Sequence, residues 1–89
     1  MVEKYDVISI TRENMSGSGL AEGSEHYVAF ACKECEMIGI ILNELGEEEL
    51  VIFIPTQHVK VIGEANSNMT RRYIDDVENK HNLRKCGHL

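Results

Sequence analysis

Residues 24–46, SEHYVAFACKECEMIGIILNELG, decide the fold, because the stretch fits two different structures. As a helix, it spaces its apolar residues in alternating steps of three and four, the pattern of an amphipathic helix. Ser24 then serves as the N-cap, and Gly46 ends the helix. As two strands, 26–32 and 35–42, the same stretch is a hairpin that turns over Lys33 and Glu34.

We favour the helix, because the tight turn of a hairpin needs residues that tolerate positive φ, and Lys33 and Glu34 are poor choices. Gly39 is the argument against it, since a glycine inside a helix costs about 1 kcal/mol. The hairpin therefore stays open as the alternative, and it is typical of a small SH3/Sm-like β-barrel.

The flanking segments predict three strands and a second helix. Segments 5–11, 49–54 and 58–63 are rich in β-branched residues. Segment 49–54 is apolar on both faces, which predicts a central strand. Asparagine and serine at 66–68 precede a helix over 69–85. The expected fold is α+β in the order β-α-β-β-α, with two helices packed on a small sheet; the alternative is the small β-barrel with a C-terminal helix.

Length and charge limit the function. The 89 residues make one domain, with a flexible Gly/Ser loop at 14–23 and a tail at 86–89. The net charge of -6 repels phosphate backbones, so nucleic acid is not an expected partner. No apolar run approaches the ~18 residues of a membrane span, and residues 1–6 do not form a signal peptide. Three cysteines, an odd number, indicate a reducing, cytoplasmic setting.

The cysteines also raise the question of a metal. Cys32 and Cys35 form a C-x-x-C motif, and Cys86 and His88 complete the four ligands of a Cys3His zinc site. His81 is a second choice for the nitrogen ligand. The favoured interpretation is that the two motif cysteines are small buried side chains, so no cofactor is expected and zinc is the alternative.

The function that these observations favour is a non-catalytic adaptor or inhibitor that docks on another protein. The broad apolar arc of a helix over 24–46 exceeds what one sheet covers, which predicts a homodimer. Two groups of residues are candidate contacts, one on the last helix and one at an acidic corner: Arg71, Arg72 and Tyr73, and Glu47, Glu48 and Glu49. A third hypothesis is a small-ligand sensor or enzyme with a pocket between the glycine loop and His58. The four histidines are scattered, so no catalytic residues are predicted.

Overall fold

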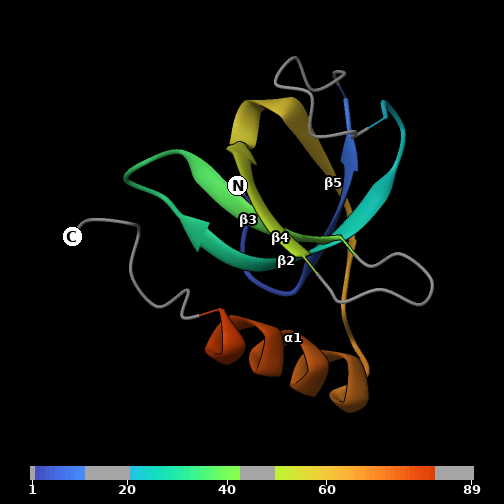
Figure 1. Ribbon diagram of the computed structural model, residues 1–89. Coiled ribbons are helices and arrows are strands. Elements are labelled where there is room, and N and C mark those ends of the chain that lie inside the picture. The colour runs from blue at the N-terminus through green and yellow to red at the C-terminus, as the bar shows by residue number, and fades with distance from the viewer. Residues whose placement is uncertain (1, 12–20, 43–49, 82–89) are drawn as a thin grey trace.

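The computed structural model describes residues 2–11, 21–42 and 50–81. These residues form β1 (Asp6–Ile10), β2 (Glu25–Cys32), β3 (Met37–Leu42), β4 (Leu50–Pro55), the 3-10 turn η1 (Thr56–His58), β5 (Val59–Glu64) and α1 (Asn68–Lys80). All five strands belong to one antiparallel sheet in the order β4-β3-β2-β1-β5 (Figure 1). The protein is therefore a small, mostly-β domain with one C-terminal helix.

The predicted helix over residues 24–46 is wrong. Its place is taken by β2, a turn at 33–36 and β3, so the described chain has one α-helix where two were expected. The apolar stripe has another cause: β2 and β3 are buried on both faces, by a core inside the curved sheet and by α1 outside it. Ser24 does not cap a helix, because its hydroxyl donates to the Ala21 carbonyl at 2.7 Å.

The turn between β2 and β3 is longer than the two-residue turn that argued against a hairpin. It spans residues 33–36, and the positive φ falls on Glu36, at 55°, rather than on Lys33 or Glu34. A second correction concerns segment 49–54, which becomes β4 at an edge of the sheet and not a central strand. After η1 the chain crosses to the opposite edge, where β5 pairs with β1.

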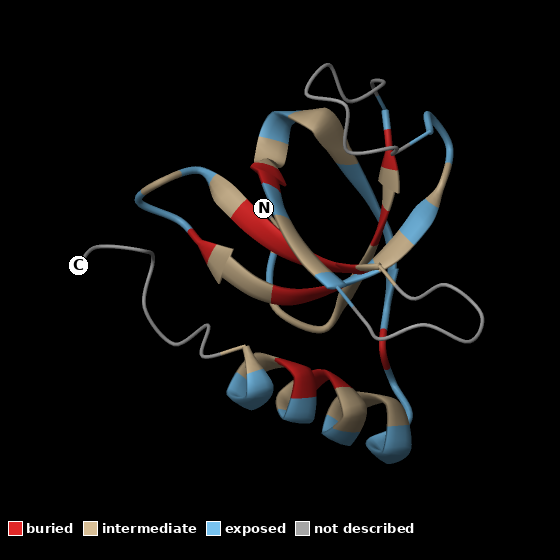
Figure 2. Cartoon of the chain, viewed as in Figure 1, coloured by how far each residue is buried: buried red, intermediate tan, exposed pale blue. Residues whose placement is uncertain are grey.

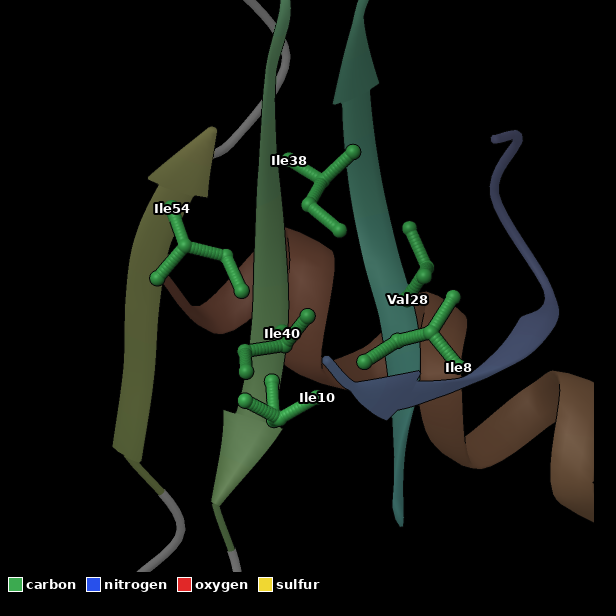
Figure 3. Close-up of a cluster of buried hydrophobic side chains, with 6 residues drawn as sticks. All are labelled: Ile8, Ile10, Val28, Ile38, Ile40 and Ile54. Atoms are coloured by element: carbon green, nitrogen blue, oxygen red, sulfur yellow. The ribbon is translucent and has the colours of Figure 1, made fainter. Parts of the chain in front are cut away.

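Two hydrophobic cores lie on opposite sides of the sheet. The inner core is enclosed by the curve of β1 to β4, and Figure 3 shows its side chains converging: Ile8, Ile10, Val28, Ile38, Ile40 and Ile54. The outer core lies between the sheet and α1, and Figure 2 shows the buried segment of α1 on the side that faces the sheet. This core consists of Ala29, Ile41, Ala65, Ile74 and Val77. A strand that contributes to both cores has no polar face. Its sequence therefore lacks the alternation of apolar and polar residues that identifies a half-buried strand.

A bulge in β2 allows the outer core to form. Val28 pairs with Ile40 and Phe30 with Gly39, so Ala29 is the extra residue. Ala29 and Phe30 both pack on the side of α1. The missing side chain at Gly39 leaves room there, because a Cβ would lie 3.1 Å from Phe53 Cε1 and 3.3 Å from Val51 Cγ1. Gly39 thus lets the side chains of Phe53 and Val51 approach the backbone of β3 closely.

Helix α1 begins within one residue of its predicted start. Ser67 is the N-cap, and its hydroxyl accepts the Thr70 N–H at 3.5 Å. Ile74 and Val77 are the buried residues. The helix ends at Lys80, five residues before the predicted end, and residues 82–89 lie outside the described part of the chain. No helix among the described residues has the length and apolar character needed to cross a bilayer.

Candidate functional site

The first candidate surface is the outer edge of β4. The strand pairs along its whole length with β3, from Leu42–Leu50 to Met37–Pro55, and no other described strand pairs with it. Its sequence, LVIFIP, contains no charged residue. Leu50 is 58% exposed and Phe53 is 50% exposed. An edge strand with exposed apolar side chains is a template for another strand.

The opposite edge of the same sheet is different. β5 reads VKVIGE and carries Lys60 and Glu64, and Ile62 is an extra residue that bulges from the pairing with β1. Charged residues and bulges are the features with which proteins protect an edge from unwanted pairing. Among the described residues, β4 has neither a charged residue nor a bulge, although Pro55 at its end is a feature of protected edges.

The outer face of β4 continues into an aromatic surface. The rings of Phe53 and Phe30 meet edge to face, with centroids 6.3 Å apart and planes at 77°. Phe30 packs against the outer core, so the Phe53 ring is held at one side while half of it faces solvent. Aromatic side chains of this kind supply much of the binding free energy at protein interfaces.

The second candidate is the cysteine turn between β2 and β3. It brings Cys32 and Cys35 together: the Cys35 N–H donates to Cys32 Sγ at 3.3 Å. The carbonyl of Glu36 accepts from the Thr56 N–H at 2.9 Å and from Thr56 Oγ1 at 3.3 Å, which ties the turn to η1. Cys32 is disulfide-bonded, whereas Cys35 is a thiol. The bond at Cys32 differs from the reduced thiols that the odd cysteine count predicted.

The remaining predicted metal ligands are not placed beside this turn. Cys86 and His88 lie outside the described residues, as do Glu47, Glu48 and Glu49 of the predicted acidic corner. Within residues 2–11, 21–42 and 50–81, no group of three or more histidine, cysteine or acidic side chains is arranged to hold a metal ion.

A cavity of about 550 Å³ opens beside the cysteine turn. Its apolar lining comes from Val2, Ala31, Val59 and Val61, and its polar lining includes Lys33, Glu36, Thr56 and Gln57. The pocket that sequence predicted lay elsewhere, between the glycine loop and His58. Most of that loop, residues 14–20, is outside the described part of the chain.

The predicted contact residues of α1 take part in the fold itself. Arg71 Nε donates to the Ala65 carbonyl at 2.7 Å, and its guanidinium lies 4.9 Å from the centre of the Tyr5 ring. Tyr73 packs against the outer core. Arg72 is the exposed member of the trio. Because Arg71 and Tyr73 make contacts within the fold, the candidate docking surface is the edge of β4 and not α1.

An ionic cluster fastens α1 to the N-terminal segment. Lys4 Nζ contacts Asp75 Oδ1 at 2.7 Å and Glu78 Oε1 at 2.8 Å, and the Tyr5 hydroxyl donates to Asp75 Oδ1 at 2.7 Å. Hydrogen bonds from Lys4 and Tyr5 lower the pKa of Asp75. Burial alone would lower the pKa of Lys4, but hydrogen bonds to Asp75 and Glu78 outweigh it and the pKa is raised. Each charge in the cluster is paired, which is the arrangement of a structural clamp.

A serine–histidine contact also forms, which the sequence did not predict. His26 Nε2 lies 3.0 Å from Ser24 Oγ. The Ser24 hydroxyl donates to the Ala21 carbonyl at 2.7 Å, and the His26 ring also hydrogen-bonds the backbone of Ile41. Burial lowers the pKa of His26. Both side chains of the pair are therefore also bonded to the backbone of the fold.

Comparison with known proteins gives no assignment, since neither a family model nor a curated protein nor a solved structure matches the chain.

Sequence reasoning missed the β4 edge because it placed that strand in the centre of the sheet. The signal was present: six uncharged residues between Glu49 and Thr56, followed by a second, charged strand. The sequence did not reveal the strand order, which decides whether an apolar strand has a neighbouring strand on each side or lies at an edge.

Proposed function

We propose that the protein is a non-catalytic interaction module that associates through the β4 edge, and that the occupant of this edge is a second copy of the chain. The observation that supports the proposal most is the contrast between the uncharged, half-exposed β4 edge and the charged, bulged β5 edge of the same sheet. Antiparallel β4–β4′ pairing would join two sheets across a two-fold axis, the commonest symmetry of dimers.

Charge favours a second copy at this edge over a charged partner. The chain has a net charge of -6, so two copies repel each other over most of their surfaces. At β4 the edge carries no charge, and two such strands can approach without desolvating an ion. Pairing β4 with the β5 edge of another copy would instead bring Lys60 and Glu64 to the interface.

The alternation of side chains limits the register. Ile52 and Ile54 face the inner core, whereas Val51 faces the outer core. In the paired β4 and β4′ strands, side chains that lie directly opposite each other point to the same face of the sheet. The two-fold axis must therefore pass between one residue and its own copy in the partner strand. With Ile52 at the axis, Phe53 lies opposite Val51′, an aromatic–β-branched pair of the kind that stabilises sheets. An interface built on one six-residue strand is small, which predicts a dimer that dissociates on dilution.

Sedimentation velocity over a range of protein concentrations tests this function. Phe53→Lys places a charge on the outer face at the edge and is expected to weaken the dimer about tenfold or more. Ile62→Lys is the matched control, since Ile62 is 46% exposed on the other edge, and it should leave the dimer unchanged. Leu50→Lys is the second variant should Phe53→Lys impair folding. A wild-type chain that stays monomeric, or equal weakening by Ile62→Lys, would contradict the proposal.

A cytoplasmic location belongs to the same proposal, supported by the odd number of cysteines. Alkylation of thiols in intact cells, followed by mass spectrometry, checks it. The structure has Cys32 in a disulfide, so the proposal requires that this bond be reduced in the cell. Cys32 is then expected to be trapped as a thiol, and a Cys32 disulfide in freshly trapped cells would argue against a reducing compartment.

A further inference from the structure

We propose that the cavity beside the cysteine turn binds a free amino acid with an apolar or aromatic side chain. The cavity is lined by residues of the β2–β3 turn, η1 and β5, and its volume of about 550 Å³ lies within the range of small-ligand sites. None of the lining residues belongs to β4, so this site is independent of the proposed dimer.

The apolar lining of the cavity is continuous with the inner core. Val2, Ala31 and Val59 line the cavity and also pack against that core. Their side chains are short, and the core that they cover contains Ile8 and Ile38, which are completely buried. A ligand can therefore bury a short apolar group against these residues. A long acyl chain would instead have to displace a close-packed core.

The polar lining carries one charge of each sign. Lys33 and Glu36 both belong to the β2–β3 turn, and both are exposed. The Lys33 ammonium lies 3.7 Å from a carboxylate oxygen of Glu3, and the two side chains are 61% and 64% exposed. An ion pair of this kind contributes little, so a ligand can replace it. The hydrogen bonds between Glu36 and Thr56 use the Glu36 carbonyl and do not engage its carboxylate.

A zwitterion matches this arrangement. The carboxylate of an amino acid can pair with Lys33 and its ammonium with Glu36, while its side chain occupies the apolar part of the cavity. Thr56 and Gln57 add a hydroxyl and an amide that hydrogen-bond charged groups of either sign. Phosphate ligands fit less well, because Lys33 is the only basic residue among the described ones that line the cavity, and the chain carries a net charge of -6.

Amide chemical shifts of the isotope-labelled full chain, recorded during titration with L-leucine and with L-phenylalanine, test the site. The expected result is a set of shifts centred on residues 31–36 and 56–61, with a Kd of about 1 mM or below. Two analogues separate the charges, because N-acetyl-L-leucine lacks the ammonium and L-leucinamide lacks the carboxylate. Each analogue is expected to bind about two- to fivefold more weakly than L-leucine.

Four variants assign these effects to residues. Val61→Lys puts a charge into the apolar lining and should weaken binding about tenfold or more. Ile62→Lys is the matched control and should bind as the wild type does, because Ile62 does not line the cavity and is 46% exposed against 40% for Val61. Lys33→Gln should weaken the binding of L-leucine but not of L-leucinamide. Glu36→Gln should weaken the binding of L-leucine but not of N-acetyl-L-leucine.

Three outcomes would overturn the proposal. The first is the absence of shifts with both amino acids, and the second is equal weakening by Val61→Lys and Ile62→Lys. The third is binding of both analogues as tightly as L-leucine, which would mean that the charges of the ligand are not recognised. The amide spectrum of each variant also shows whether it is folded. Lys33→Gln and Glu36→Gln change exposed positions of the turn and keep the test decisive if Val61→Lys does not fold.

Discussion

Single residues of this domain are constrained by what lies across the sheet from them. Gly39 shows this most clearly: it faces Phe53, Val51 and Phe30, and the ring of Phe53 rests over it. In a helix this glycine would only weaken the structure, whereas in β3 it creates the space that the aromatic pair occupies. The position was visible in the sequence, but the reason for glycine depends on β4, which is distant along the chain.

Gly39→Val tests that interpretation. A valine would press on Val51 and on the Phe53 ring, and overpacking of this kind destabilises a domain by about 2 kcal/mol. Urea denaturation measures the change in the free energy of unfolding. Gly63→Val on β5 is the control, because nothing lies within 4 Å of a Cβ there, and its effect should be smaller. Equal losses would show that Gly39 serves the strand in general and not the contact.

At the scale of elements, α1 is held by apolar burial and by the clamp of Lys4, Tyr5 and Asp75. The sequence predicted the helix and its N-cap, because both depend on residues that are neighbours along the chain. It did not predict the clamp, since Lys4 and Tyr5 come from the other end of the chain. Nor did it identify the hairpin, whose two buried faces imitate a helical stripe; the positive φ at Glu36 has no sequence signature comparable to glycine.

The clamp predicts how stability depends on pH. The pKa of Asp75 is lowered from its ordinary value of 3.8 by hydrogen bonds from Lys4 and Tyr5, so the unfolded chain takes up the proton first. Its contribution is complete above pH 3.8 and is lost as the pH falls through the lowered pKa. Asp75 is 44% exposed, which limits the contribution to about 1 kcal/mol. Asp75→Asn should remove this acid-dependent part in melting curves at pH 7 and pH 3.

Two observations make that prediction specific. Asp76→Asn, at the exposed neighbouring residue, should leave the pH dependence intact. Burial lowers the pKa of His26 from 6.5, so stability already declines as the pH falls below that value, and Asp75→Asn should not alter this earlier step. If Asp75→Asn and the wild type lose stability in parallel between pH 5 and pH 2, the clamp does not carry the acid sensitivity.

For the whole molecule, the asymmetry of the sheet is the basis of the proposed function. One edge is charged and bulged and the other is apolar, so association is directed to β4. The homodimer was predicted from an apolar helical arc that does not exist; the structure assigns that apolar surface to the two cores and leaves a smaller one at the edge. The predicted dimer through a helix and the proposed dimer through β4 differ because the sequence did not reveal the strand order of the sheet.

Hydrogen exchange of the β4 amides, measured at several protein concentrations, tests the central claim most directly. If β4 pairs with β4′, the amides of residues 50–54 should become more protected as the dimer forms, while those of β5 should not change. Protection that grows at β5, or a β4 strand whose exchange is the same in monomer and dimer, would contradict the account.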